Sequence, residues 1–350
     1  MKITRVAITA AICAAAVYFS APAFGADKLH SPNWDATLAT QAASLPAGQA
    51  QLQDLFSLVR ASDKTALGSR LDQVIRGGSL SQPVRDAVLF NFTIGLADFD
   101  EIDTEIIDQL RTVEPMVWVS HEERAGVGVP LFNIAGAAEG IYQLQARRSA
   151  VDMSKARLGE SPMGWVEAFL DADSAQRKGF VDSLAEASST ELEGVMNQSL
   201  QQLAAASELT PVAGKSALLL GDVEALQQVI QDGSGADLAR IIEAAGATLS
   251  RQDAFALLEH AVAHASAVNA SLAISQLFKS VETMPEANEL LFSKLGDAEL
   301  GSTAALTLAG IDSMDIRARL QELAQENEGL APARARIALE MGSTRAGAER

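Results

Sequence analysis

Apolar residues recur every three or four positions along most of the chain, with polar residues between them. Leu67, Leu71 and Val74, for example, fall on one side of a helical projection, which is the spacing of an amphipathic α-helix. Runs of β-branched or aromatic residues that would mark strands are scarce. The pattern therefore predicts an all-α protein from Pro46 onward, preceded by an extended lead-in over residues 26–45.

Short breaks divide this pattern into helices of about ten to sixteen residues. Aspartate, serine or threonine precedes many of them. Such a side chain predicts a helix start, because its oxygen accepts a hydrogen bond from a backbone N–H group of the first turn. The caps expected on this basis are Asp63, Thr210, Asp222, Ser250 and Asp312.

The longest polar interruption, residues 149–164, predicts a boundary between two helical regions. We expect an N-terminal helical domain over residues 46–148 and a second helical region over residues 164–341. The last residues, 342–350, contain no apolar anchor and are predicted to form a disordered tail.

Parts of the second region are similar to one another. Residues 215–233 and 302–325 each begin with small and apolar residues and continue with an aspartate that is followed by apolar residues at positions +4 and +8. Residues 333–342 repeat the first half of this unit, and residues 269–278 do so more loosely. The central residues of the last three copies are 34 and 31 positions apart, namely Leu272, Leu306 and Ile337. Such a period is typical of solenoids built from paired helices.

The stretch ALLLGDVEAL within residues 215–233 resembles a unit of the HEAT-repeat family, especially its short bacterial HEAT-like forms. In those units a first helix of small residues ends near a Gly-Asp turn, and an amphipathic second helix follows. The resemblance covers residues 210–341, with a less regular insertion over 233–266. Arg317 matches an arginine that the family often carries in its second helix, although the other copy has glutamines there. The resemblance implies an α-solenoid of antiparallel helix pairs; the alternative fold is an irregular helical bundle.

Composition and charge narrow the classes of partner. Apolar residues make up 48% of the chain and aromatic residues only 5%. The apolar residues are therefore mostly aliphatic, with many alanines and leucines, which favour helices. The formal net charge of −18 disfavours nucleic acids, whose phosphates bind basic surfaces, and disfavours adhesion to anionic membranes by charge alone. A partner protein with a basic patch would be steered towards such a chain.

Residues 1–25 have the pattern of a secretory signal peptide. Lys2 and Arg5 precede an apolar run, and small residues lead to a cleavage site before Ala26. An uncleaved anchor is the alternative, although the run is short for a bilayer span. We therefore expect a periplasmic or secreted protein with no membrane span in its mature chain. The only cysteine, Cys13, lies in the signal, so the mature chain is cysteine-free and has no thiolate chemistry.

The stretch LEHAVAHASA contains two of the four histidines, His260 and His264. On a helix this spacing places two imidazoles on one face, as in many zinc sites. A helical projection puts both rings away from the apolar face. That face comprises Ala254, Phe255, Leu258, Ala261, Val262 and Ala265. The zinc-protease pattern H-E-x-x-H is not present, and no third ligand follows. We prefer a surface or interface pair that titrates near neutral pH to a metal site.

Two other segments contain residues that could bind a calcium ion or a ligand. The acidic run over residues 98–108 lacks the glycine and glutamate positions of a calcium loop, so a helix start with acids near the positive end of its dipole is expected. Residues 115–132 are the least helical part of the chain. For this segment we favour a connection packed by Trp118 over a binding loop.

These features favour an exported, non-catalytic protein that binds another protein or acts as a scaffold, because solenoids present an extended surface to partners. Two alternatives remain: a metal-dependent enzyme that uses His260 and His264, and a carrier of an apolar ligand. No catalytic residue and no cofactor are predicted.

Overall fold

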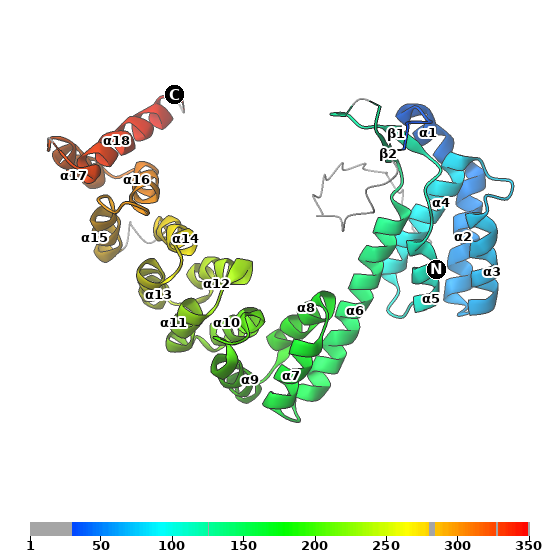
Figure 1. The fold of residues 1–350 in the computed structure, drawn as a ribbon, viewed down its shortest axis with the longest axis horizontal. Helices are drawn as coiled ribbons and strands as arrows, with labels where there is room; N and C mark the ends of the chain where they lie inside the picture. Colours follow the sequence, from blue (N-terminus) through cyan, green and yellow to red (C-terminus); the bar gives the residue numbers. More distant parts are fainter. Residues whose placement is uncertain (1–29, 125, 280–283, 327, 349–350) are drawn as a thin grey trace, which may run out of the picture. The chain divides into compact units, whose positions relative to one another are not determined.

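The computed structural model describes residues 30–124, 126–279, 284–326 and 328–348. Over these residues the chain is all-α apart from one pair of short strands (Figure 1), which confirms the predicted fold class. The chain divides into two compact units, residues 1–141 and 142–350. The expected signal peptide, residues 1–25, lies outside the described residues. No helix in the described part of the chain has the length and apolar character needed to cross a membrane.

The first unit contains short helices, a β-hairpin and the beginning of a long helix. Its described elements are α1 (Ala36–Ala43), α2 (Pro46–Arg60), α3 (Lys64–Ile75), α4 (Gln82–Gly95), the 3₁₀ helix η1 (Leu96–Asp98), α5 (Thr104–Arg111), β1 (Trp118–Ser120), β2 (Gly128–Pro130) and α6 (Ile134–Leu158). The strands are antiparallel, with Val119 opposite Val129. Helix α1 corrects the expected extended lead-in. Asp35 caps it by accepting a hydrogen bond from the Leu38 N–H at 3.0 Å, and a helix this short gives little periodic signal.

Helix α4 is the central helix of the first unit and packs against α1, α2, α3 and α5. Every residue from Pro83 to Leu89 is buried, including the charged Arg85 and Asp86. The surrounding helices contribute fully buried leucines such as Leu55. Because this stretch of α4 is covered on all sides, its two charged residues require partners within the protein.

The second unit contains the rest of α6 and twelve further α-helices in the described residues. They are α7 (Pro162–Asp171), α8 (Ser174–Ser183), α9 (Ser189–Gln202), α10 (Thr210–Leu220), α11 (Val223–Asp232), α12 (Gly235–Thr248), α13 (Arg251–His264), α14 (Ala267–Leu277), α15 (Pro285–Lys294), α16 (Gly301–Ala309), α17 (Met314–Ala324) and α18 (Leu330–Ala348). Two 3₁₀ helices, η2 (Leu184–Glu186) and η3 (Ser207–Leu209), lie between them.

From α9 onward the helices form two layers (Figure 1). Helices α10, α12, α14, α16 and α18, here called the even layer, pack against one another in succession. Helices α9, α11, α13, α15 and α17, the odd layer, lie beside them, and each packs against at least one helix of the even layer. One continuous apolar core runs through the stack from Ala150 to Ala338. This packing of helices against their neighbours is compatible with a helical repeat.

The similar sequence segments occupy equivalent places in the stack, since all four of their first halves lie in α10, α14, α16 or α18. Residues 233–266, expected to be a less regular insertion, form another helix pair, α12 and α13, which packs in the same succession. These helices have 14 residues each, whereas α10 and α11 have 11 and 10. Because α12 and α13 are longer than α10 and α11, their residues do not follow the spacing that indicates the repeat elsewhere in the sequence.

Three of the five expected caps are confirmed. Asp63, Asp222 and Ser250 each accept a hydrogen bond from the backbone N–H three residues later. Ser313 rather than Asp312 caps α17. Thr210 is the first residue of α10, which continues from η3 without a side-chain cap.

The polar stretch 149–164 is largely helical, because α6 continues to Leu158 and α7 begins at Pro162. Ala150, Ser154 and Leu158 follow one another at four-residue intervals and are buried, so the polar residues between them lie on the exposed sides of α6. Helix α18 likewise continues to Ala348, through most of the predicted disordered tail, where alanine and arginine favour helix.

Replacing Gly179 with alanine should destabilise the second unit. A Cβ atom at this position of α8 would overlap the carbonyl oxygen of Arg147 in α6, and overpacking of this kind costs about 1–3 kcal/mol. Gly246→Ala in α12 is the matched control, since a Cβ there meets nothing within 4 Å and should stabilise the helix by about 0.5–1 kcal/mol. Urea denaturation followed by circular dichroism measures both, and an unchanged midpoint for Gly179→Ala would contradict the close packing of α6 and α8.

Candidate functional site

The two histidines of α13 lie together on its outer side, as the helical projection predicted. Their ring centroids are 4.3 Å apart and the ring planes make an angle of 34°. His260 is partly buried and His264 is exposed. Most of the expected apolar face is buried, namely Ala254, Phe255, Leu258, Ala261 and Val262.

His260 makes a hydrogen bond between two successive helices of the odd layer. The Gln231 side-chain nitrogen in α11 lies 3.1 Å from His260 Nε2, an arrangement in which the amide donates and a neutral imidazole accepts. Burial, and then the positive charge of His264, lower the pKa of His260, against a hydrogen bond with the Gln227 backbone that raises it. The neutral imidazole is therefore favoured, and His260 helps to join α11 to α13.

The pair supplies two ligands for a metal ion, and a zinc site needs at least three from the protein. Across the residues that the structure describes, no group of three or more His, Cys, Asp or Glu side chains lies close enough to hold a metal. The geometry therefore gives no support to a catalytic metal at His260 and His264.

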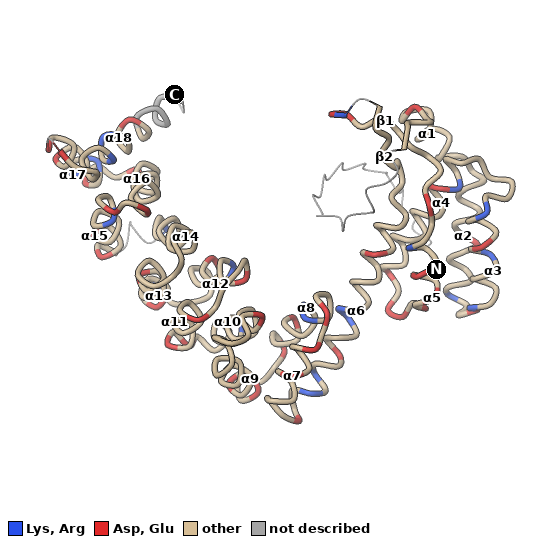
Figure 2. Tube along the Cα trace, in the orientation of Figure 1, with Lys and Arg blue, Asp and Glu red and all other residues tan. Residues whose placement is uncertain are grey.

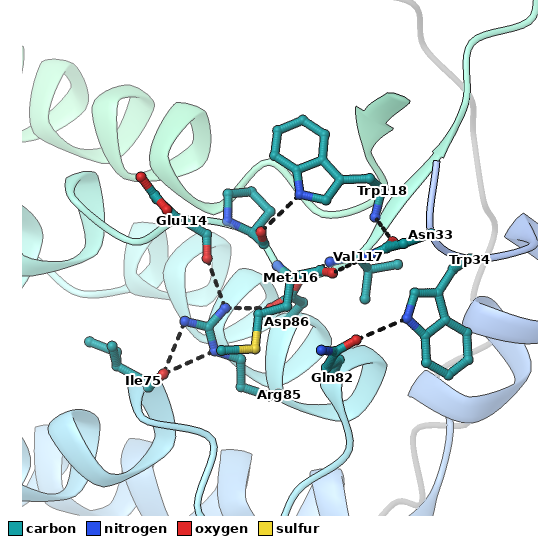
Figure 3. Close-up of polar contacts among 11 residues, drawn as sticks. Asn33, Trp34, Ile75, Gln82, Arg85, Asp86, Glu114, Met116, Val117 and Trp118 are labelled. Atoms are coloured by element: carbon teal, nitrogen blue, oxygen red, sulfur yellow. Dashed lines mark hydrogen bonds and ion pairs between the residues drawn. The ribbon is translucent and has the colours of Figure 1, made fainter. Parts of the chain in front are cut away.

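A second polar cluster, which the sequence analysis missed, surrounds Asp86 in the first unit (Figure 3). Asp86 is fully buried. Its carboxylate accepts hydrogen bonds from Arg85 Nη1 at 2.6 Å and from the backbone N–H groups of Met116 and Val117 at 2.7 and 2.9 Å. The cluster thus fastens the segment before β1 to α4.

The Arg85 guanidinium, only 3% exposed, uses its other donors on backbone carbonyls. Nε and Nη2 donate to the carbonyl of Ile75 at 3.2 and 3.0 Å, and Nη1 donates to that of Glu114 at 2.9 Å (Figure 3). These contacts join the end of α3, α4 and the segment before β1. In the sequence, these contacts are indicated only by two adjacent residues of opposite charge within an otherwise apolar stretch of α4.

Trp118 packs against the first described residues of the chain. Its backbone N–H donates to Asn33 Oδ1 at 2.8 Å, and its carbonyl accepts from the N–H groups of Asn33 and Trp34 at 2.9 and 3.1 Å. Its ring stacks on His30 with centroids 3.8 Å apart. The least helical segment is therefore a packed connection in this structure, held by the residues that precede α1.

The acidic run over residues 98–108 contains a helix start, as expected. Asp103 caps α5 by accepting a hydrogen bond from the Glu105 N–H at 3.0 Å. Lys64 Nζ lies 2.9 Å from the Asp103 carboxylate, and this hydrogen bond lowers the pKa of Asp103.

The two layers of the second unit differ in charge (Figure 2). Each odd-layer helix carries two acidic residues. The even layer is less uniform: α14 and α16 contain no Asp, Glu, Lys or Arg, α10 contains no acid, α18 contains one, and α12 carries two. Figure 2 shows the acidic positions that follow the odd layer, together with the charged positions of α12.

Large exposed apolar side chains show the opposite distribution. Among the described residues the even layer exposes Leu219, Val268, Leu306, Leu330, Ile337 and Met341, whereas the odd layer exposes Met314. Leu306 and Ile337 are 54% and 51% exposed and belong to α16 and α18, which pack against each other. The even layer therefore combines two uncharged helices, α14 and α16, with most of the exposed apolar side chains of the stack, a composition typical of protein-binding surfaces.

A concavity of about 430 Å³ lies among α15, α17 and α18. Arg319 in its lining makes a two-pronged ion pair with Glu289, at 2.6 and 2.9 Å, and its guanidinium lies 4.1 Å from the centre of the Phe292 ring. These contacts join α15 to α17. The Arg319 guanidinium is thus engaged by residues of the protein itself.

Removing the Asp86 carboxylate should strongly destabilise the first unit. Asp86→Ala would leave the Arg85 charge and two backbone N–H groups buried without their acceptor, at a cost of about 3–5 kcal/mol. Asp108→Ala, which affects the largely exposed ion pair with Arg111, should change stability by less than about 1 kcal/mol. Urea denaturation followed by tryptophan fluorescence compares the two, and equal effects would show that the buried cluster has no special role.

Acidification should weaken the second unit partly through His260. The unfolded chain takes up a proton at the ordinary histidine pKa of about 6.5, whereas the folded chain does so at lower pH. The unfolded state therefore binds more protons in this window, and the free energy of unfolding decreases as the pH falls. His260→Gln should lose less stability than the wild type between about pH 8 and about pH 5.5. Urea titrations at both pH values measure this difference, and an equal or larger loss in the variant would contradict it.

Comparisons of the chain with protein-family models, with curated proteins and with solved structures found no match.

Proposed function

We propose that this chain is an exported, non-catalytic helical-repeat protein that binds another protein along the even layer. The observation that carries the proposal is the contrast between the two layers. The even layer exposes large apolar residues and includes two helices without any charge, whereas every helix of the odd layer carries two acidic residues. A protein that exposes both sides only to water gains nothing from keeping apolar side chains on one of them.

Removing water from the even layer when a partner covers it costs little free energy, because two of its helices carry no charge. The centres of protein interfaces are depleted in charged residues for this reason, and α14 and α16 contain none. The acids of the odd layer keep the protein soluble when the even layer is covered. Together with the net charge of −18, they would attract a partner that has a basic patch outside its apolar contact.

We assign the stack from α10 to α18 to a HEAT-like solenoid within this proposal. The turn between α10 and α11 supports the assignment, because Gly221 has a φ of +68° and Asp222 caps the following helix. A glycine in this left-handed conformation ends a helix at little cost. The internal similarity over residues 210–341 and the succession of the even-layer helices agree with it.

Export is the other part of the proposal and rests on residues 1–25. Their basic start, apolar run and small residues before Ala26 are the features of a secretory signal peptide. The partner would then be another periplasmic or secreted protein.

Charged residues at the exposed apolar positions should strongly reduce partner capture. The tagged protein is immobilised and exposed to the periplasmic fraction at low salt, and bound proteins are identified by mass spectrometry. Leu306→Glu combined with Ile337→Glu should reduce capture at least about tenfold, since substitution at the centre of an interface costs about 2 kcal/mol or more.

Met314→Glu is the matched control, because Met314 is an exposed apolar residue of the odd layer and its substitution should leave capture unchanged. Circular dichroism verifies that all variants are folded. Capture that is equal for the double variant and the wild type, or lost only in Met314→Glu, would refute the proposed binding side.

A further inference from the structure

A cavity of about 490 Å³ lies in the first unit, among α3, α4, the end of α5 and the segment before β1. Its volume falls within the range of about 300–1,000 Å³ that is typical of small-molecule sites. Three charged residues line it, namely Asp72 of α3, Arg85 of α4 and Glu114 of the segment before β1. All lining residues belong to the first unit, so the cavity contains no residue of the even layer.

Arg85 offers this cavity one hydrogen-bond donor. A guanidinium group has five N–H hydrogens. Nε and one hydrogen of Nη2 donate to the Ile75 carbonyl, and Nη1 donates both of its hydrogens, to Asp86 and to the Glu114 carbonyl. The second Nη2 hydrogen has no acceptor among the residues that the structure describes. Because the side chain is only 3% exposed and lines the cavity, an acceptor from outside reaches this charged donor by way of the cavity.

Asp72 offers the same cavity an acceptor. Its Oδ1 accepts a hydrogen bond from the Gln109 side-chain nitrogen. Its Oδ2 lies 3.9 Å from the nearest Arg76 nitrogen, which is beyond hydrogen-bond distance. The Asp72 carboxylate can therefore accept a further hydrogen bond from a ligand in the cavity.

The charges of the lining favour a cation over an anion. The positive charge of Arg85 is balanced by the Asp86 carboxylate at 2.6 Å. Asp72 and Glu114 then give the lining a negative net charge. The ion pair of Asp72 with Arg76 is long and exposed, so it offsets little of this charge. An ammonium group on the ligand would balance it and donate to the second Asp72 oxygen.

Four further lining residues are apolar, namely Ile75, Val113, Pro115 and Met116. Val113 is buried and the other three are half-buried. Ile75 and Met116 are drawn around the Arg85 guanidinium in Figure 3, so apolar surface lies beside the polar groups of the cavity. An aliphatic group of a ligand would lose its contact with water against this surface, which favours binding.

We infer that the cavity binds the amino terminus of a peptide whose first residue is aliphatic. The ammonium group donates to Asp72, the first carbonyl oxygen accepts from Arg85 Nη2, and the side chain lies against the apolar lining. A free amino acid has the same ammonium group and side chain, but Asp72 and Glu114 repel its carboxylate. The inference goes beyond the proposed function, because it assigns a second binding site in a different unit.

The test is a titration of the mature protein, residues 26–350, followed by NMR of methionine methyl groups labelled with ¹³C. Met116 reports on the cavity, and Met116→Leu identifies its signal. Met196, which is buried in the second unit, is the internal reference. The four ligands are Leu-Ala-amide, acetyl-Leu-Ala-amide without the ammonium group, isoamylamine without the carbonyl group, and leucine with a free carboxylate.

We expect Leu-Ala-amide to shift the Met116 signal in a saturable manner and to leave the Met196 signal unchanged. Acetyl-Leu-Ala-amide and isoamylamine should each bind at least about tenfold more weakly, because each lacks one charge-assisted hydrogen bond. Leucine should also bind at least about tenfold more weakly, because like charges repel.

A variant of the protein tests the carboxylate directly. Asp72→Asn should weaken binding of Leu-Ala-amide at least about tenfold and leave binding of the acetyl peptide unchanged. Asp54→Asn is the matched control, since the Asp54 carboxylate is similarly exposed and pairs with Arg70 at 2.7 Å in α3, but does not line the cavity. It should leave the affinity for Leu-Ala-amide unchanged. Circular dichroism verifies that both variants are folded.

The absence of a saturable Met116 shift, or equal affinities for Leu-Ala-amide and its acetyl form, would overturn the proposal. Equal affinity for isoamylamine would overturn it in favour of a general cation site, and tighter binding of leucine would overturn it in favour of an amino-acid site. The titration depends on Asp72 and Arg85, whereas the capture experiment depends on Leu306 and Ile337. Either can therefore fail while the other succeeds.

Discussion

Each helix pair of the second unit leaves an apolar side that only the next pair can cover, and the whole stack depends on this mutual burial. Small residues make it possible. Gly214 of α10, for instance, leaves the space that the Ile241 side chain of α12 occupies, so successive even-layer helices approach closely. The result is a core that is continuous along the stack but belongs to no single pair. Stability in such an arrangement is shared between neighbours.

The first unit is held together in a different way. The first half of its central helix is buried on every side, and the Arg85–Asp86 pair there joins α3, α4 and the segment before β1 through hydrogen bonds to backbone groups. A buried ion pair is seldom a net source of stability compared with apolar packing. Its directional bonds, however, specify which backbone segment lies against α4. In the second unit the helices meet mainly along repeated apolar sides, and Arg334 of α18 adds hydrogen bonds to the backbone carbonyls of Leu295 and Ala298.

The sequence predicted the helices well, because a helix of three turns buries one side and so leaves a periodic pattern. It also placed His260 and His264 off the apolar face of α13, since that placement depends only on helical periodicity. It missed α1, which is too short to show a period. It also described residues 233–266 as a less regular insertion and did not recognise α12 and α13 as a pair, because these helices are longer than α10 and α11. Arg85 and Asp86 could not be interpreted locally, because their partners Ile75, Glu114 and Met116 are brought to them only by the fold. The contrast between the layers was likewise hidden, as it appears only when residues of helices distant in sequence are viewed on one side.

The contacts that hold the first described residues have a consequence for the order of folding. Asn33 is separated by 83 and 85 residues from the two residues that it binds before and within β1. Contacts between successive odd-layer helices, such as Gln231 with His260 and Glu289 with Arg319, span only 29 and 30 residues. Closing the longer loop costs more chain entropy before any contact is gained. A helix pair of the second unit can therefore make its contacts as soon as the next pair has been synthesised, whereas residues 30–34 must wait for the hairpin. Residues 30–34 are thus among the last described residues of their unit to become ordered.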